Sequence, residues 1–224
     1  MRILFDIGAN RGDATLAGLN MGFDKVVAVE PTPKMMALLA YNFHKDERVV
    51  PIKMAASDID GDKIEFYECV EDGLSTMNLE WLTDETAPYN GKDYKKITAY
   101  TITIDHLAEV YGTPELIKVD VEGAECQVLW GMTKIKPERI AFEWHINWPW
   151  EVTNCLEYLA TLGYKEYALQ YITHHLVEPT EYRPIKKTDF LKWHASTKDW
   201  WESTGWEEQG SLRPTSDAGM IWVR

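Results

Sequence analysis

The first twelve residues, MRILFDIGANRG, constrain the fold more than any other part of the chain. Ile3 to Ile7 form a short apolar run that only Asp6 interrupts, which is typical of a buried parallel strand. Gly8 and Gly12 then let the backbone turn tightly and approach a ligand. Helical character resumes from Thr15 to Leu19. A strand, a glycine turn and a helix N-terminus together predict a site that presents backbone N–H groups to a nucleotide-like cofactor.

An acidic residue follows at the end of the next predicted strand, Lys25 to Pro31. There Glu30 can accept hydrogen bonds from two ribose hydroxyls. The competing interpretation is that the glycines of the turn serve packing alone. The combination of a glycine turn with a distant acid favours a cofactor site.

The turn departs from the dinucleotide fingerprint G-x-G-x-x-G. Asn10 stands at the second glycine position and Asp13 at the third. A pyrophosphate would meet the carboxylate of Asp13, a repulsion that a phosphate site should avoid. S-adenosylmethionine carries an amine, a sulfonium and a ribose but no phosphate. We therefore expect it as the cofactor, with Asp6 near its ammonium and Glu30 on its ribose.

Composition and charge narrow the class of protein. The chain has 224 residues and a net charge of −13, which repels nucleic acid and anionic membranes. No apolar run approaches the ~20 residues of a membrane span, and the N-terminal apolar stretch breaks at Asp6. Cys69, Cys126 and Cys155 have no zinc-type spacing. We expect a cytoplasmic protein (host cytoplasm if the gene is viral) that neither binds nucleic acid nor inserts into a membrane.

Strand and helix patterns alternate along the chain, which predicts one α/β domain over residues 1–224 with a mainly parallel sheet. Thr32 resembles an N-cap and Pro33 a first-turn proline. Further helices are expected at Lys34–Phe43, Asp105–Tyr111 and Glu151–Leu162, and further strands at Val49–Ala56, Lys63–Val70, Ile97–Ile104, Arg139–Trp144, Glu166–Ile172 and Gly219–Val223.

The carboxyl end of the predicted strand Val49–Ala56 is expected to contact the cofactor. In a doubly wound sheet its carboxyl end faces the cofactor crevice. We therefore expect Ser57 or Asp58 to meet the adenine, and Ala56 and Ser57 to belong to the cofactor-binding residues. Asp58 is either a further contact or a carboxylate satisfied within its own turn.

Acidic and imidazole groups end two later strands. Asp120 and Glu122 follow an apolar strand and would point to the same side if it continued, while Lys118 within it is expected to pair with one carboxylate. Glu143 and His145 end the strand that begins at Arg139. Such neighbouring strand ends build a polar floor beside a sulfonium, although His145 could instead be a core histidine.

Tryptophans dominate the rest of the chain. We expect Trp144, Trp148 and Trp150 to bind the substrate. The region 174–217, an insertion before the last strand, adds Trp193, Trp200, Trp201 and Trp206 without regular periodicity. It is either an acceptor-binding lid that stacks on sugar faces or a satellite core that covers the sheet.

Three blocks of sequence resemble the FkbM-type methyltransferases: DIGANRGD from Asp6, VEPTP from Val29 and IKVDVEGAE from Ile117. The resemblance covers about Met1 to His145. It implies a Rossmann-like class I methyltransferase fold, with a seven-stranded, mainly parallel sheet whose last strand is antiparallel and helices on both faces. It also implies O-methylation, frequently of a sugar hydroxyl.

Carried over by position, the resemblance implies that one group of residues binds the cofactor and another lines the reaction chamber. The first group is Asp6, Gly8, Asn10, Gly12 and Glu30, and the second is Asp120, Glu122 and Glu143.

Methyl transfer needs an in-line attack and one base, with no covalent enzyme intermediate. We expect His145 to be that base, because its pKa normally lies nearest neutral pH, with Glu143 orienting it. In the competing version, Asp120, Glu143 and His145 hold a divalent cation that acidifies the hydroxyl. The rival functions are an NAD-dependent oxidoreductase, which Asn10 and Asp13 disfavour, and a non-catalytic S-adenosylmethionine-binding protein.

Overall fold

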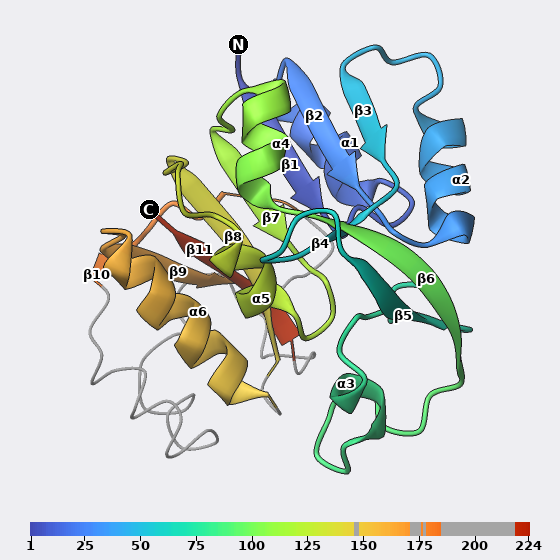
Figure 1. Ribbon diagram of the computed structural model, residues 1–224. Helices are drawn as coiled ribbons and strands as arrows, with labels where there is room; N and C mark the ends of the chain where they lie inside the picture. Colours follow the sequence, from blue (N-terminus) through green and yellow to red (C-terminus); the bar gives the residue numbers. More distant parts are fainter. Residues whose placement is uncertain (146–147, 171–175, 177, 185–217) are drawn as a thin grey trace.

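A mainly parallel sheet forms the centre of the computed structural model, which describes residues 1–145, 148–170, 176, 178–184 and 218–224 (Figure 1). The strand order is β10-β9-β11-β8-β7-β1-β2-β3. The strands are β1 (Ile3–Ile7), β2 (Lys25–Val29), β3 (Val49–Ile52), β7 (Leu116–Val119), β8 (Arg139–His145), β9 (Glu166–Gln170), β10 (Arg183–Pro184) and β11 (Ala218–Val223).

The direction of these strands confirms the predicted fold class. Strands β1, β2, β3, β7 and β8 pair in parallel. The last strand, β11, runs antiparallel between β8 and β9. The two-residue strand β10 extends the predicted seven strands at the β9 edge. The arrangement is the class I methyltransferase type of fold.

Helices cover both faces of the sheet, as expected. They are α1 (Asp13–Asn20), α2 (Pro33–Asn42), α4 (Ile104–Tyr111), α5 (Glu125–Trp130) and α6 (Pro149–Thr161). The short helix α3 (Glu80–Thr83) lies apart from them, in the segment between β5 (Lys63–Cys69) and β6 (Tyr94–Ile102) of a smaller sheet. Figure 1 shows α4, α5 and α6 in front of the sheet and α1 behind it.

The alternation of side chains in β1 explains this layering. Phe5 and Ile7 pack with α4, α5 and α6, whereas Leu4 packs with Leu19 of α1 and Leu39 of α2. All of them are nearly or fully buried. Burying each such side chain contributes about 1.5–3 kcal/mol, so the two layers hold the sheet from both sides.

A smaller sheet stands beside the first, in the order β4-β6-β5, with β4 (Ala55–Ala56), β5 (Lys63–Cys69) and β6 (Tyr94–Ile102). The prediction of one strand from Val49 to Ala56 is therefore wrong. The chain turns at Met54, whose N–H donates to the carbonyl of Ile52 at 3.1 Å, and Ala55 and Ala56 then pair with β6. Two short strands of different sheets thus share a run of apolar residues that only Lys53 interrupts.

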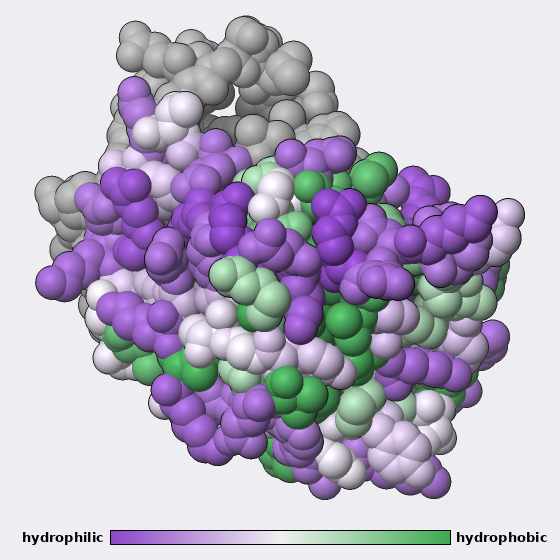
Figure 2. All heavy atoms as spheres, turned by 90° about the horizontal axis from the view of Figure 1, so that it is seen from above, coloured by the Kyte–Doolittle hydropathy of each residue, from purple (hydrophilic) through white to green (hydrophobic). Residues whose placement is uncertain are grey.

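Hydrophilic side chains dominate the face of the molecule drawn in Figure 2, and hydrophobic ones form small groups between them. Every helix in the described part of the chain is too short or too polar to span a bilayer. The tryptophan-rich region 174–217 lies outside the described residues except for 176 and 178–184.

Candidate active site

A cavity of about 480 Å³ opens at the carboxyl ends of the central strands. The chain proceeds from β1 to β2 and β3 on one side, and returns to β7 and β8 on the other. Open α/β sheets bind ligands at such a reversal of strand order. Its lining includes Gly8, Glu30, Thr32, Met35, Ala55, Ala56, Phe66, Tyr89, Asp120, Glu122, Glu143 and His145.

Gly8 holds the glycine turn against the neighbouring strand. Its φ is +75°, and an added Cβ would lie 1.8 Å from the main-chain oxygen of Asp120. The N–H groups of Gly8 and Ala9 both donate to the carbonyl of Val29, at 3.0 and 2.9 Å. A side chain at position 8 would therefore push two strand ends apart, and only glycine fits.

Gly12 and Asn10 shape the same turn without lining the cavity. A Cβ on Gly12 would lie 2.3 Å from Phe43 and 2.8 Å from Leu39, so this glycine serves packing between the turn and α2. Asn10 has a φ of 50°, and its backbone N–H donates to Glu30 at 3.0 Å. The contacts of Gly12 therefore fit the packing interpretation of the glycines, whereas Asn10 helps to hold the carboxylate of Glu30.

Glu30 lines the cavity at the end of β2, as predicted, but much of its hydrogen-bonding capacity is already used. Its Oε1 accepts from the backbone N–H and the hydroxyl of Thr32, at 2.8 and 2.6 Å, and its Oε2 accepts from Asn10. Thr32 precedes α2 as expected, yet its hydroxyl bonds Glu30 and makes no cap bond. Burial raises the pKa of Glu30, and the bonds from Thr32 and Asn10 oppose that rise.

Besides Gly12 and Asn10, three further predicted cofactor residues lie outside the lining. Asp6 is fully buried, and its carboxylate accepts from Thr15 at 2.6 Å. Asp13 is exposed and bonds Arg11 at 2.9 Å, so the repulsion we assigned to it does not face the cavity. Ser57 bonds the Asp58 carboxylate at 3.0 Å, while its neighbour Ala56 does line the cavity. The sequence pattern could not show that these side chains turn away.

Lys118 joins the glycine turn to the acidic strand end, and the predicted ion pair is confirmed. Its Nζ lies 3.3 Å from Asp6 and 3.4 Å from Asp120, and donates to the carbonyl of Gly8 at 2.8 Å. Burial alone would lower the pKa of Lys118, but the carboxylates of Asp120 and Asp6 outweigh it and the net shift is upward. Lys118 therefore stays charged behind the turn.

Glu122, Glu143 and His145 form a buried cluster at the β7 and β8 side of the cavity. One potential ligand atom from each lies within 4.8 Å of the others. Burial, with repulsion from Asp120 and Glu125, raises the pKa of Glu122 well above its usual range, and burial, with repulsion from Asp120 and Glu122, does the same to Glu143. Asp120 lines the cavity nearby, so all four predicted catalytic residues meet at one wall.

Sequence reasoning missed the side chains that contact this cluster. Trp81 of α3 donates to Glu122 at 3.3 Å, and the hydroxyl of Tyr89 lies 3.2 Å from Nε2 of His145. The Trp81 ring also meets that of His145 edge-on, with centroids 5.3 Å apart. Both aromatics belong to the segment between β5 and β6, in which we predicted no site residue.

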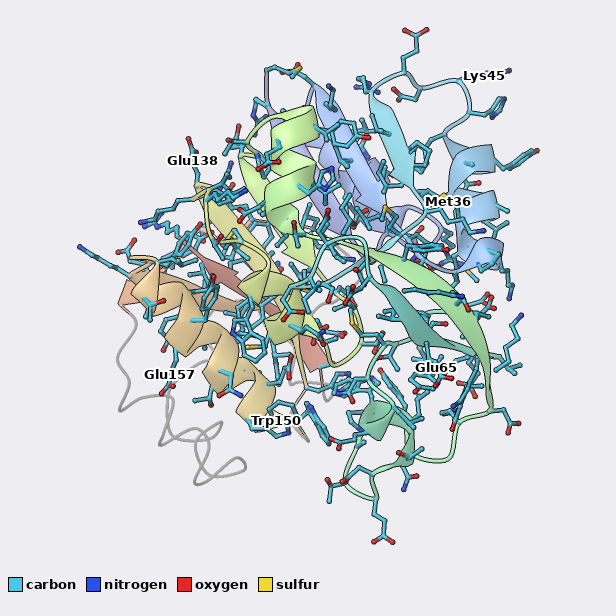
Figure 3. The ribbon with its side chains drawn as sticks, in the orientation of Figure 1. Met36, Lys45, Glu65, Glu138, Trp150 and Glu157 are labelled. Atoms are coloured by element: carbon cyan, nitrogen blue, oxygen red, sulfur yellow. The ribbon has the colours of Figure 1, made fainter. Side chains whose placement is uncertain are left out.

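The three tryptophans predicted to bind substrate do not line the cavity. Trp144 alternates with Glu143 and His145 along β8 and packs in the core with α5 and α6. Trp148 is buried against Trp81, with centroids 5.5 Å apart. Trp150 lies on the outside at the start of α6 with 41% of its surface exposed (Figure 3). The period of two in a strand explains the placement of Trp144.

The glycine turn and the cluster of Glu122, Glu143 and His145 both lie within a stretch of sequence that matches a known family. A family model described as the methyltransferase FkbM domain matches residues 6–166. The chain belongs to the FkbM methyltransferase family. The resemblance found in its three sequence blocks is thus confirmed, and this FkbM protein is an S-adenosylmethionine-dependent methyltransferase.

Solved structures similar to the FkbM protein are distant in sequence. Precorrin-6y C5,15-methyltransferase from Geobacter metallireducens GS-15 is 11% identical with a TM-score of 0.44, over 99% of this chain and 80% of that one. An rRNA methylase from Streptococcus thermophilus is 10% identical with a TM-score of 0.44, over 100% and 86%. An S-adenosylmethionine-dependent O-methyltransferase from Thermotoga maritima is 15% identical with a TM-score of 0.41, over 99% and 58%. No curated protein matches the chain.

Proposed function

We propose that this FkbM methyltransferase transfers the methyl group of S-adenosylmethionine to a hydroxyl of a sugar or glycan. One observation carries the proposal: the glycine turn with Glu30 and the cluster of Glu122, Glu143 and His145 line a single cavity. The first part suits an adenosine-bearing donor. The second offers groups that handle a hydroxyl proton.

The cofactor would lie over Gly8, with its ribose at Glu30 and its adenine towards Ala56. A carboxylate has about four lone-pair sites. Oε1 of Glu30 already accepts two hydrogen bonds and Oε2 accepts one, so one site remains for a ribose hydroxyl. A second ribose bond requires the Thr32 hydroxyl to turn away. This refines the expectation that Glu30 takes both hydroxyls.

Electrostatics support a donor without phosphate. Carboxyl groups of Glu30, Asp120, Glu122 and Glu143 line the cavity. A pyrophosphate there would bring further negative charge to buried acids, which is unfavourable. A sulfonium and an ammonium bring positive charge instead. The argument against a phosphate-bearing cofactor therefore depends on these four carboxyl groups and not on Asp13.

The chemistry is one displacement. The acceptor oxygen forms a bond to the methyl carbon, the carbon–sulfur bond breaks, and its electron pair stays on sulfur to give S-adenosylhomocysteine. The hydroxyl proton passes to the imidazole of His145, whose ring is placed by Tyr89 and Trp81. Holding the reactants in line can remove roughly 7–11 kcal/mol of barrier, more than a base supplies.

The sugar assignment rests on the mixed character of the wall. The ring of Tyr89 and that of Phe66 offer apolar faces for a sugar ring, while the carboxyl groups accept from its hydroxyls. In the competing version of the proton step, a divalent cation on the carboxyl groups and His145 acidifies the hydroxyl. Undiminished activity in a strong chelator would exclude that version.

The test is formation of S-adenosylhomocysteine from S-adenosylmethionine with a panel of sugars and glycans, beside amine and carboxylic acid acceptors. We expect turnover with at least one sugar and a methyl ether as product. Methylation of nitrogen or of a carboxylate would overturn the hydroxyl assignment. Binding of S-adenosylhomocysteine without turnover on any acceptor would favour the non-catalytic alternative, and preferential binding of NAD the oxidoreductase.

A further inference from the structure

Glu143 is the feature of the cavity that its other contacts leave unexplained. It stands near the end of β8 with 6% of its surface exposed. Its Oε2 is buried and has no hydrogen-bond partner among the described residues. An unpaired buried carboxyl oxygen is costly, on the order of 1–3 kcal/mol or more when charged. A ligand that binds this oxygen in the cavity would remove that cost.

Two other side chains that can bind a metal ion lie beside Glu143. Glu122 and His145 place ligand atoms within 4.8 Å of that of Glu143 and of each other, and all three are buried. Metal–ligand bonds of about 2.0–2.6 Å allow ligand atoms around one ion to lie up to roughly 4–5 Å apart. The three groups can therefore meet one ion with small side-chain rotations.

The charge around the cluster also calls for a cation. Asp120 and Glu125 act on Glu122 and Glu143 as further negative neighbours. Lys118 opposes them, but its ammonium is already shared by Asp6, Asp120 and the carbonyl of Gly8. The cofactor's sulfonium could add positive charge, yet it offers no coordination site to a carboxylate. A metal ion both neutralises and binds such oxygens.

The geometry points to a divalent cation site formed by Glu122, Glu143 and His145, with positions left open to the cavity. Two carboxylates and one imidazole suit a Mn²⁺- or Zn²⁺-like ion. The site replaces the ligand set expected from the sequence, because Glu122 rather than Asp120 joins the cluster.

The chemical role of the ion rests on the proposed function. An acceptor hydroxyl that coordinates the ion becomes more acidic and is held in place. With the ion bound, His145 is a ligand and no longer the base that it is in the metal-free version. The hydroxyl proton then passes to the carboxylate of Asp120, which lines the cavity outside the cluster. The methyl group, the carbon–sulfur electron pair and the products are unchanged.

The backbone conformation of Glu122 also supports a binding site. Its φ of 60° is a left-handed conformation that costs a non-glycine residue roughly 1–2 kcal/mol. The hydroxyl of Thr76 donates to its carbonyl at 2.7 Å, and Trp81 donates to its Oε2. These contacts hold the carboxylate in place towards Glu143.

The test is a titration of the full chain with Mn²⁺, followed by electron paramagnetic resonance, with and without S-adenosylhomocysteine. We expect one tightly bound Mn²⁺ per chain, and nitrogen coupling from the imidazole in the pulsed spectrum. Glu143→Gln, which preserves shape and removes the charge, should weaken binding at least about 10-fold. His145→Gln should remove the nitrogen coupling.

Asp72→Asn is the matched control, because Asp72 also lines the cavity but is exposed and bonded to Lys34. It should keep the affinity of the wild type for Mn²⁺. Absence of bound Mn²⁺ at millimolar concentration would overturn the site, as would equal affinity in wild type and in Glu143→Gln. Binding of S-adenosylhomocysteine is measured separately, so failure of the metal site and failure of the methyltransferase proposal are distinguishable. If Glu143→Gln does not fold, Glu122→Gln takes its place.

Discussion

Lys118 donates a 2.8 Å hydrogen bond from its ammonium to the main-chain carbonyl of Gly8, so one buried cation fixes the glycine turn to the strand that carries Asp120. The link joins two strands that are far apart in sequence but adjacent in the sheet. The cofactor side and the acidic side of the cavity thereby share one support.

Lys118→Met should therefore disturb both sides. The change leaves Asp6 and Asp120 without their cation, and breaking a buried ion pair from one side costs about 3–5 kcal/mol. We expect the free energy of unfolding to fall by that order and the affinity for S-adenosylhomocysteine to fall with it. Denaturant titration and calorimetry measure the two effects. Unchanged stability would show that Lys118 does not support the turn.

Gly8→Ala should abolish cofactor binding, because the added Cβ would lie 1.8 Å from the Asp120 carbonyl. The matched control is Gly61→Ala. Gly61 has a nearly equal φ of +76°, and nothing lies within 4 Å of its added Cβ. Both variants carry the same backbone strain, so only the clash separates them. Equal affinities for S-adenosylhomocysteine in the two variants would remove Gly8 from the cofactor site.

Glu151→Gln should flatten the dependence of stability on pH. Burial raises the pKa of Glu151 to about 7, from 4.5 in a free side chain. Between these values the folded state holds a proton that the unfolded state has lost, so stability falls as pH rises from about 4.5 to 7. The slope for one such group is about 1.4 kcal/mol per pH unit.

The measurement for Glu151 is urea unfolding at pH 5, 6, 7 and 8. The loss of stability with rising pH should be smaller in Glu151→Gln than in the wild type. Glu157→Gln is the control, because Glu157 is exposed on the same helix (Figure 3). A wild type whose stability rises across this range would contradict the assignment.

His145→Ala should lower turnover by at least about 10²-fold, whether the imidazole accepts the proton or holds a cation. Affinity for S-adenosylhomocysteine should stay within a few-fold, because β7 and β1 separate the strand of His145 from the strand that Glu30 follows. Glu65→Gln, on an exposed position of β5 (Figure 3), is the activity control. A near-normal rate for His145→Ala would place the proton step elsewhere.

Local patterns predicted much of this fold because they follow from single elements. The apolar run before Gly8, the first-turn proline of α2 and the acid after β2 can each be recognised without knowledge of the rest of the chain. Lys118 was also predictable, because a cation in a buried strand requires an anionic partner. The sequence therefore placed Glu30, Asp120, Glu122, Glu143 and His145 at one edge of the sheet.

Contacts between distant segments were not predictable in the same way. Trp81 and Tyr89 reach the cluster from a segment whose path depends on how β5 and β6 pair. Asp13 lies in the predicted turn, but nothing local shows that its side chain bonds Arg11 and faces solvent. Trp144 was open to prediction, because alternation in a strand already places it opposite Glu143.

The measurement that tests the account most directly is isothermal calorimetry of the purified full chain with S-adenosylmethionine, S-adenosylhomocysteine and NAD. We predict that the first two bind one to a chain, that NAD does not, and that Gly8→Ala loses the binding while Gly61→Ala keeps it. A folded wild type that ignores both adenosyl compounds at millimolar concentration would contradict the assignment of this cavity.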